Sequence, residues 1–267
     1  MKIMRNISDL NKAISKVNDL GFVPTMGSLH DGHQSLINIS KFRSKETIVS
    51  IFVNPKQFNK RKDFNSYPRN NENDLKLLKK LKVNYVFMPS VKDIYKKKRN
   101  KKIKLKKSDF IMCAKFRNGH FEGVLDVIER FLLLIKPKFI FMGEKDFQQL
   151  FLIKKFFKNK FNTKIISCPT IRNKNKLALS SRNFLLKKRD QIKAEIIAKY
   201  LINLKKSILK KNKSLSNEKK YLEKKFSILI EYLEVRNIHN LKTANFKRKF
   251  RLFVAYYING IRLIDNF

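Results

Sequence analysis

Short apolar runs alternate with amphipathic stretches over the first 170 residues, and this alternation restricts the fold more than any other feature of the chain. The apolar runs are 20–23, 47–53, 84–88, 139–142 and 164–168. Run 47–53, with the sequence TIVSIFV, is nearly continuous in β-branched residues, as strands covered on both faces usually are. Strands and helices in alternation predict an α/β fold with a parallel, doubly wound sheet and right-handed crossovers.

The pattern changes beyond residue 170. A polar turn at 177–185 precedes helical stretches that reach residues 211 and 230, and three short apolar runs follow them. Helices followed by strands indicate a second, smaller α+β domain. We therefore expect one domain over residues 1–170 and a C-terminal domain over residues 171–267.

The segment 22–36, FVPTMGSLHDGHQSL, joins the first predicted strand to the next helix. We expect the strand to end at Pro24 and the helix to begin near His33. Two of the chain's four His, His30 and His33, lie three residues apart here, and Gly27 and Gly32 allow a ligand to approach the backbone closely. Unpaired N–H groups and the positive end of a helix dipole favour an anion. The segment predicts a phosphate site; a metal-ligating pair and two surface imidazoles are the alternatives.

The chain is strongly basic, with 62 Lys plus Arg against 21 Asp plus Glu and a formal net charge of +41. Such a charge suits nucleic acid or an anionic surface. The basic residues are spread from end to end, however, and the densest run, 96–107, has no aromatic residue among its lysines. We therefore expect run 96–107 to be a solvated loop, the basic composition to reflect compositional drift, and no nucleic-acid partner. The alternative from another class is a basic RNA-binding protein that has lost activity.

Cysteine usage and hydropathy indicate the compartment. Cys113 and Cys168 show no CxxC spacing and no His at ligand spacing, so neither a disulfide framework nor a zinc site is expected. The N-terminus lacks the apolar core of a signal peptide, and no stretch approaches the ~20 apolar residues of a membrane span. We expect a cytoplasmic protein that does not enter the membrane.

Several strings together resemble one known family. There is no GxxxxGK followed by Ser or Thr and no GxGxxG, but PTMGSLHDGH at 24–33 resembles the signature of pantothenate synthetases (pantoate–beta-alanine ligases), within the HxGH nucleotidyltransferase superfamily. Further strings of that family follow in its order, namely SIFVNPKQF at 50–58, YPR at 67–69, GHF at 119–121, GEKDFQQL at 143–150, LALSSRN at 177–183 and RLIDN at 262–266. The resemblance covers nearly the whole chain.

This resemblance implies a fold and a reaction. It implies a Rossmann-like nucleotidyltransferase domain followed by a C-terminal α+β lid domain. The implied reaction is the ATP-dependent condensation of pantoate with β-alanine through a pantoyl adenylate, giving pantothenate, AMP and pyrophosphate. Mg²⁺ would be bound mainly through the ATP phosphates, and a homodimer is expected. The runner-up, a nucleotidyltransferase that moves AMP or CMP onto another acceptor, fits the strings around Gln57 and Gln149 less well.

The resemblance also implies a set of site residues. ATP would lie on Met26, Gly27, Ser28, Leu29, His30, Asp31, Gly32, His33, Gly143, Glu144, Lys145, Asp146, Ile171, Leu179, Ser180, Ser181 and Arg182. Pantoate and β-alanine would lie on Gln57, Gln149, Asn54, Thr25 and Met26. Direct parts in catalysis would fall to His33, His30, Lys145 and Arg182, with His33 in the family's proton-donor position. No metal site made of protein ligands is implied.

Some of these residues have more specific implied roles. Asp146 would accept sugar hydroxyls, Ile171 would line the adenine pocket, and residues 180–182 would close over the triphosphate. Asn54 would either fix its loop or contact substrate directly. Asn118 and Glu122 depart from the family pattern, which has Pro and Arg there, so we carry no role over to the segment around His120.

Overall fold

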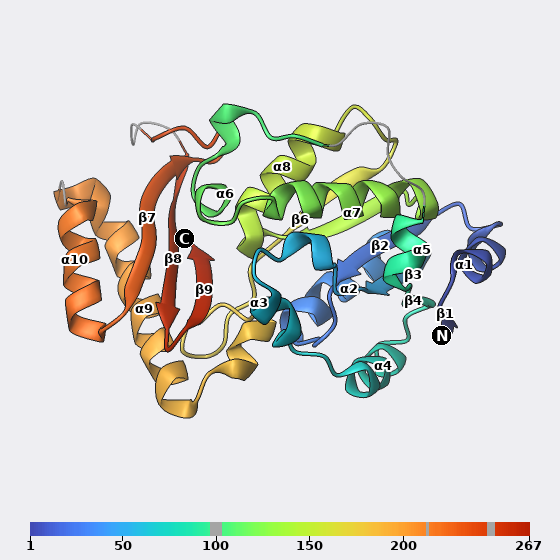
Figure 1. Cartoon of the computed structure of the whole chain (residues 1–267), viewed down its shortest axis with the longest axis horizontal. Helices are drawn as coiled ribbons and strands as arrows, with labels where there is room; N and C mark the ends of the chain where they lie inside the picture. Colours follow the sequence, from blue (N-terminus) through green and yellow to red (C-terminus); the bar gives the residue numbers. More distant parts are fainter. Residues whose placement is uncertain (97–102, 212–213, 245–248) are drawn as a thin grey trace. The chain divides into compact units, whose positions relative to one another are not determined.

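The computed structural model describes residues 1–96, 103–211, 214–244 and 249–267. It divides into two compact units, unit 1 (Met1–Pro169) and unit 2 (Thr170–Phe267), drawn from blue to red in Figure 1. Residues 97–102 of the Lys-rich run lie outside the described residues. Among the helices in the described ranges, none is long and apolar enough to cross a membrane.

Unit 1 is built on a six-stranded sheet with the order β1-β4-β3-β2-β5-β6, and its strands pair in parallel. The strands are β1 (Lys2–Met4), β2 (Leu20–Thr25), β3 (Glu46–Ile51), β4 (Tyr85–Phe87), β5 (Phe139–Gly143) and β6 (Lys164–Cys168). This confirms the predicted parallel α/β sheet. The three-residue edge strand β1 was not predicted from the sequence.

Helices follow the strands of unit 1 along the chain (Figure 1). They are α1 (Ile7–Ile14), α2 (Asp31–Arg43), α3 (Arg61–Asn65), α4 (Asn71–Lys80), α5 (Val91–Tyr95), α6 (Cys113–Phe116), α7 (His120–Ile135) and α8 (Phe147–Phe157). Short 3-10 turns are η1 (Pro55–Gln57), η2 (Lys107–Asp109) and η3 (Glu144–Asp146).

Neighbouring residues of β2 show how both faces of the sheet are covered. The ring of Phe22 packs edge to face on Phe131 of α7, with centroids 5.5 Å apart. Val23 instead belongs to a buried cluster with Ile37 of α2 and Leu78 of α4. Successive strand residues point to opposite faces of a sheet, so α7 covers one face and α2 and α4 cover the other. This explains why the apolar runs are continuous rather than alternating.

Two boundaries around the first loop differ from the sequence expectation. Strand β2 runs through Pro24 to Thr25, because β3 pairs along all six residues while β5 pairs only with Gly21 and Phe22. Helix α2 begins at Asp31, two residues earlier than expected, because the side chain of the preceding residue caps it.

Unit 2 is an α+β unit, as predicted. Its elements are η4 (Ser181–Leu185), the helices α9 (Lys188–Lys211) and α10 (Leu215–Phe226), and the antiparallel strands β7 (Leu229–Asn237), β8 (Phe250–Ile258) and β9 (Ile261–Asn266). Buried Ile197 and Leu201 of α9 and Leu222 of α10 pack with Val254 of the sheet. Helix α10 ends four residues before residue 230, because Ser227 takes the left-handed conformation that closes the helix.

A glycine of α7 fixes the distance between that helix and η1. A Cβ at Gly123 would lie 2.2 Å from the carbonyl oxygen of Lys56 and 2.9 Å from the amide nitrogen of Gln57. Only a residue without a side chain allows this approach. The helix therefore presses directly on the turn that carries Gln57.

We expect Gly123→Ala to lower the free energy of unfolding by about 1–3 kcal/mol, because the added methyl group overpacks a backbone contact. Alanine is more favourable than glycine in a helix by ~1 kcal/mol, so helix propensity alone would make this variant more stable. Urea unfolding measures it. Gly143→Ala is the control, since its Cβ would meet nothing within 4 Å, and it should change stability by less than about 0.5 kcal/mol. An unfolding midpoint of Gly123→Ala at or above wild type contradicts the proposed contact.

Candidate active site

Three loops meet at the carboxyl edge of the unit 1 sheet. Strand β2 lies between β3 and β5, so the segments that follow these three strands emerge side by side. They are the phosphate loop (residues 26–33), the loop with η1 and the turn η3. Ligands of parallel α/β sheets bind at this edge. The fold therefore places the predicted segments of unit 1 together.

The two His of the phosphate loop cap helix α2 reciprocally. Nδ1 of His30 accepts a hydrogen bond from the N–H of Gly32 at 3.1 Å, and Nδ1 of His33 accepts one from the N–H of His30 at 3.3 Å. Their ring centroids lie 4.1 Å apart. A neutral imidazole that accepts at Nδ1 carries its proton on Nε2. Both rings are thereby fixed as Nε2–H donors.

Both imidazoles are neutral at pH 7. Burial, followed by the charges of His30 and Lys145, lowers the pKa of His33 from 6.5 to about 3. Burial and Lys145 lower the pKa of His30 to about 4, against smaller opposing effects of Asp146 and Asp31. The chemistry available to His33 is hydrogen-bond donation from Nε2–H, rather than transfer of a proton from an imidazolium.

Other N–H groups of the phosphate loop have partners within the protein. The N–H groups of Ser28 and Leu29 donate to the carboxylate of Asp74, and the N–H of Gly27 donates to Oγ1 of Thr25 at 3.2 Å. The sequence predicted that N–H groups of this kind would receive the phosphate. In the structure, these three N–H groups are instead bound to acceptors of the protein itself.

Asn54 fixes the loop that carries Gln57. Its Oδ1 accepts from the N–H of Lys56 at 3.2 Å and from the hydroxyl of Tyr95 at 2.7 Å. Its Nδ2 donates to Oε1 of Gln57 at 3.2 Å and to the carbonyl of Gly123 at 3.0 Å. Both acceptor positions and both amide protons are used, so of its two expected roles the geometry favours fixing the loop.

Gln57 is buried and is held at both ends. Its Nε2 lies 2.7 Å from the sulfur of Met26, which joins η1 to the phosphate loop. Its carbonyl accepts from Nδ1 of His120 at 2.7 Å and from Nη2 of Arg117 at 3.3 Å. The segment around His120, to which no role was assigned, therefore supports Gln57. Thr25 uses its hydroxyl to donate to the carbonyl of Ser50 at 2.6 Å.

The turn η3 brings charge to the two imidazoles. Nζ of Lys145 lies 3.4 Å from Oδ1 of Asp146, and the side chain of Asp146 is 46% exposed while that of Lys145 is 16% exposed. Gly143 and Glu144 are partly buried at the end of β5, and Gln149 is partly buried in the first turn of α8. The turn η3 thus brings a largely buried cation, Lys145, and an accessible carboxylate, Asp146, close to the imidazoles.

The remaining predicted residues belong to unit 2. Ile171 and Leu179 face each other across a hairpin, where the N–H of Leu179 donates to the carbonyl of Ile171 at 3.0 Å. Ser180 precedes η4, and its hydroxyl accepts from the N–H of Arg182 at 3.3 Å. Ser181 is buried.

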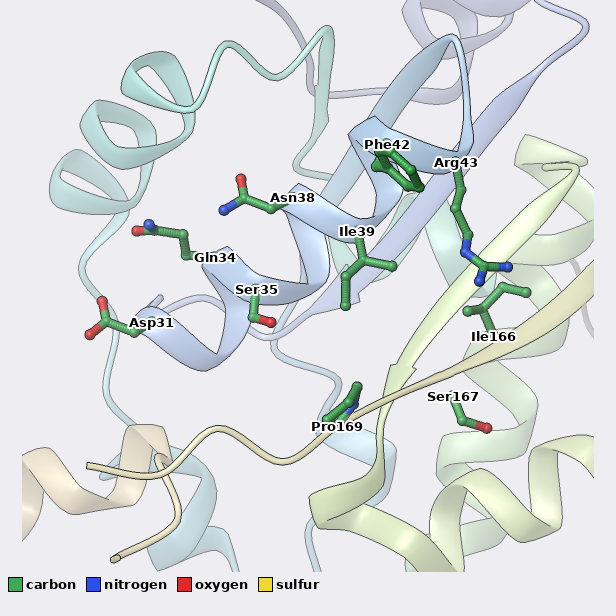
Figure 2. A pocket seen from close by; sticks show the side chains of 10 residues that line it. All are labelled: Asp31, Gln34, Ser35, Asn38, Ile39, Phe42, Arg43, Ile166, Ser167 and Pro169. Atoms are coloured by element: carbon green, nitrogen blue, oxygen red, sulfur yellow. The ribbon is translucent and has the colours of Figure 1, made fainter. Parts of the chain in front are cut away.

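A groove in unit 1 runs along α2 and β6 (Figure 2). Ser35, Ile39 and Arg43 project from α2 toward β6 in this view. The lining residues are Asp31, Gln34, Ser35, Asn38, Ile39, Phe42, Arg43, Ile166, Ser167 and Pro169. Of these, Asp31 alone belongs to the predicted site, so the groove borders the predicted ATP residues and shares one of them.

Two residues that touch the site were missed by the sequence analysis, Asp74 and Tyr95. Asp74 is 2% exposed in α4, one helical turn before the buried Leu78. A carboxylate at a buried helical position is itself a signal, since charged residues are buried only with partners. Tyr95 ends α5 just before the Lys-rich run, and its local sequence carries no comparable signal.

The low pKa values of the two imidazoles make stability depend on pH. The unfolded chain binds protons at His30 and His33 near pH 6.5, whereas the folded chain binds them only near pH 4 and pH 3. Over this window the unfolded state holds more protons, so these two groups lower the free energy of unfolding as pH falls below 6.5. We expect His30→Gln/His33→Gln to show a shallower pH dependence in urea unfolding between pH 4 and 7. A slope equal to that of wild type would refute the assigned pKa values.

Comparison with known proteins agrees with this geometry. The family model described as Pantoate-beta-alanine ligase matches residues 2–267. The pantothenate synthetase of Acetivibrio thermocellus is 36% identical over 276 residues, covering 100% of this chain and 98% of the relative. That of Carboxydothermus hydrogenoformans is 40% identical over 255 residues, covering 93% and 90%.

Solved structures give the same result. The pantothenate synthetase from Thermus thermophilus superposes with a TM-score of 0.90 at 29% identity, covering 100% of this chain and 99% of that one. The pantoate-beta-alanine ligase from Francisella tularensis, complexed with beta-gamma ATP and beta-alanine, gives 0.86 at 38% identity, covering 100% and 97%. These matches over the whole chain confirm the resemblance seen in the motifs, and the chain belongs to the pantoate–beta-alanine ligase family.

Proposed function

We propose that the unit 1 site binds ATP and pantoate side by side for the family's reaction, the ATP-dependent condensation of pantoate with β-alanine to pantothenate, AMP and pyrophosphate. The observation that carries this proposal is the pair of neutral imidazoles, each fixed as an Nε2–H donor beside Lys145. Donors of fixed orientation next to a cation suit a triphosphate whose charge changes during reaction.

ATP would bind along the phosphate loop and η3. The Nε2–H groups of His30 and His33 would donate to phosphate oxygens, and Lys145 would neutralise the charge that builds there. The accessible carboxylate of Asp146 would accept ribose hydroxyls. Catalytic parts are thus assigned to His33, His30 and Lys145 in unit 1, and to Arg182 in unit 2.

Pantoate would bind against Gln57 and Gln149. Oε1 of Gln57 already accepts from Asn54, so its Nε2 protons remain for a ligand, and one of them lies against the sulfur of Met26. A thioether is a weak acceptor, and a carboxylate or hydroxyl oxygen of pantoate would replace it with a stronger hydrogen bond. Gln149 would supply the second amide.

The chemistry needs alignment more than it needs a covalent nucleophile. A pantoate carboxylate oxygen would attack the α-phosphorus of ATP, the bond from that phosphorus to the bridging oxygen would break, and pyrophosphate would leave. The amine of β-alanine would then attack the acyl carbon of pantoyl adenylate and displace AMP. Positioning and electrostatic stabilisation by His30, His33 and Lys145 would lower the first barrier.

Mg²⁺ would be carried mainly by the ATP phosphates. Within the ranges that the structure describes, no group of three or more His, Cys, Asp or Glu side chains could hold a metal ion. Mg²⁺ at nucleotide sites commonly takes one or two carboxylates together with phosphates and water. The phosphates of ATP and water would therefore supply most of its ligands.

Unit 2 would act as a lid over ATP. Ser180, Ser181 and Arg182 carry two hydroxyls and a guanidinium, which suit several phosphate oxygens at once. Ile171 and Leu179 would contact the adenine. A reactive acyl adenylate must be kept from water, and closure of a second unit supplies that protection.

Assembly and compartment follow the family and the cysteines. We propose a homodimer, as expected from the family resemblance. Cys113 and Cys168 are buried and are not joined in a disulfide, and we propose the reducing cytoplasm as the compartment.

The order of product release tests the adenylate route. With ATP, pantoate and Mg²⁺ but no β-alanine, we expect a burst of about one pyrophosphate per active site, because the intermediate stays bound without an acceptor. AMP should appear only when β-alanine is added. Rapid-quench analysis with radiolabelled ATP measures both. Pyrophosphate that forms only after β-alanine is added, or AMP that forms steadily without it, would exclude this route.

We expect His33→Ala to lower kcat by about 10²–10³-fold, because it removes one fixed donor to the developing charge. His33→Gln should recover part of this loss, since its amide can place a donor near the former Nε2. Steady-state AMP formation is the measurement. The matched control is His239→Ala, an exposed His of unit 2 that should retain full activity. Wild-type turnover by His33→Ala would remove His33 from the mechanism.

A further inference from the structure

A buried carboxylate of helix α4 binds the backbone of the phosphate loop. Asp74 of α4 is 2% exposed. Its Oδ2 accepts from the N–H of Ser28 at 2.8 Å, and its Oδ1 accepts from the N–H of Leu29 at 2.7 Å. Both oxygens of one side chain are thus bound to successive backbone groups of a loop 45 and 46 residues away in sequence.

The backbone of the loop has a conformation that needs such a partner. Gly27 has φ +78° and Ser28 has φ +52°, so two successive residues are left-handed. A residue with a side chain adopts this region at an energetic cost. Successive N–H groups that point to one side form a small concave site for an anion. The carboxylate of Asp74 fills that site with the protein's own charge.

The packing leaves little freedom for another arrangement. A Cβ at Gly27 would lie 3.0 Å from Oδ2 of Asp74 and 3.1 Å from Cγ2 of Ile51. The loop is therefore confined between the carboxylate and strand β3. Since His30 directly follows Leu29, the position of these N–H groups sets where the capped helix starts and where both Nε2–H groups point.

Burial and hydrogen bonding act on the charge of Asp74 in opposite directions. The pKa of its carboxyl group is raised on balance, because burial raises it by more than the hydrogen bonds from Leu29 and Ser28 lower it. Two N–H donors stabilise the ionised form, because a protonated oxygen could not accept in the same way. The loop and the carboxylate thus stabilise each other.

We propose that Asp74 is a positioning residue for ATP, whose carboxylate holds the phosphate loop in the conformation that aims the Nε2–H groups of His30 and His33 at the triphosphate. This inference rests on the proposed ATP site and adds a residue that does not touch the nucleotide. Loss of the carboxylate should therefore affect ATP before it affects the other substrates.

Asp74→Asn tests this, because the amide keeps the shape of the side chain but turns one acceptor into a donor that faces an N–H group. We expect the Kd for a non-hydrolysable ATP analogue, measured by calorimetry, and the KM for ATP to rise by about 10- to 100-fold. The KM values for pantoate and β-alanine should stay within about twofold of wild type, since Gln57 has its own supports. The calorimetric arm needs no turnover, so it separates failure of this inference from failure of the proposed reaction.

Glu72→Gln is the matched control, because it removes the same charge from the same helix at an exposed side chain that pairs only with Lys76 in the described contacts. It should leave all three KM values unchanged. Unchanged ATP binding in folded Asp74→Asn overturns the inference. A parallel rise of all three KM values would also overturn it, because it would indicate a general loss of structure.

A measurement on the wild-type protein keeps the inference testable if Asp74→Asn does not fold. The amides of Ser28 and Leu29 should be protected from hydrogen exchange before ATP is added, and the ATP analogue should change their protection little. Amide-resolved NMR exchange measures this. Protection that appears only with the nucleotide would show that these N–H groups bind phosphate, and the inference would be wrong.

Discussion

The reciprocal capping of α2 by its own imidazoles is the interaction on which the rest of the site depends. The first N–H groups of a helix lack partners within it, and many proteins offer them to phosphate. Here two Nδ1 atoms accept from those groups, and the site instead presents two Nε2–H groups on rigid rings. A protonated ring could not accept at Nδ1, so the cap itself favours the neutral form that burial also imposes. One set of hydrogen bonds thereby determines geometry, tautomer and charge.

The loop that carries Gln57 is organised in the same way. Hydrogen bonds within the protein occupy one end of a side chain and thereby orient its other end. Asn54 uses its whole amide within the protein, and one of its bonds orients Gln57 by occupying the oxygen of that side chain. Tyr95 and Gly123 complete this arrangement from α5 and α7. Substrate-contacting groups held by neighbours that do not touch substrate lose little entropy on binding. Asp74 has the same relation to the phosphate loop.

The sequence predicted the parallel sheet and the α+β unit that follows it, because both depend on local patterns of apolar residues. It predicted the family, because the motif strings recur in that family. It placed α8 at its observed bounds, where apolar periodicity and a preceding turn agree. It missed β1, because three residues on a sheet edge show no periodicity. It also missed the partners of the loop, since a bond between Asp74 and Leu29 joins positions 45 residues apart and leaves no local trace. The prediction that the first strand ends at Pro24 was wrong, because β3 pairs with β2 as far as Thr25 although β5 no longer pairs there.

The capped imidazoles have a consequence for a cell whose internal acidity varies. Their pKa values of about 4 and 3 lie far below the neutral range, so a modest acidification would leave both rings uncharged. In the proposed site, their share of nucleotide binding would come from oriented dipoles rather than from a titrating charge, and it would stay constant where an ordinary histidine would change its protonation. A chain with a net charge of +41 attracts anions of every kind. At this edge of the sheet, the two uncharged donors of the proposed site would discriminate among them by shape and direction.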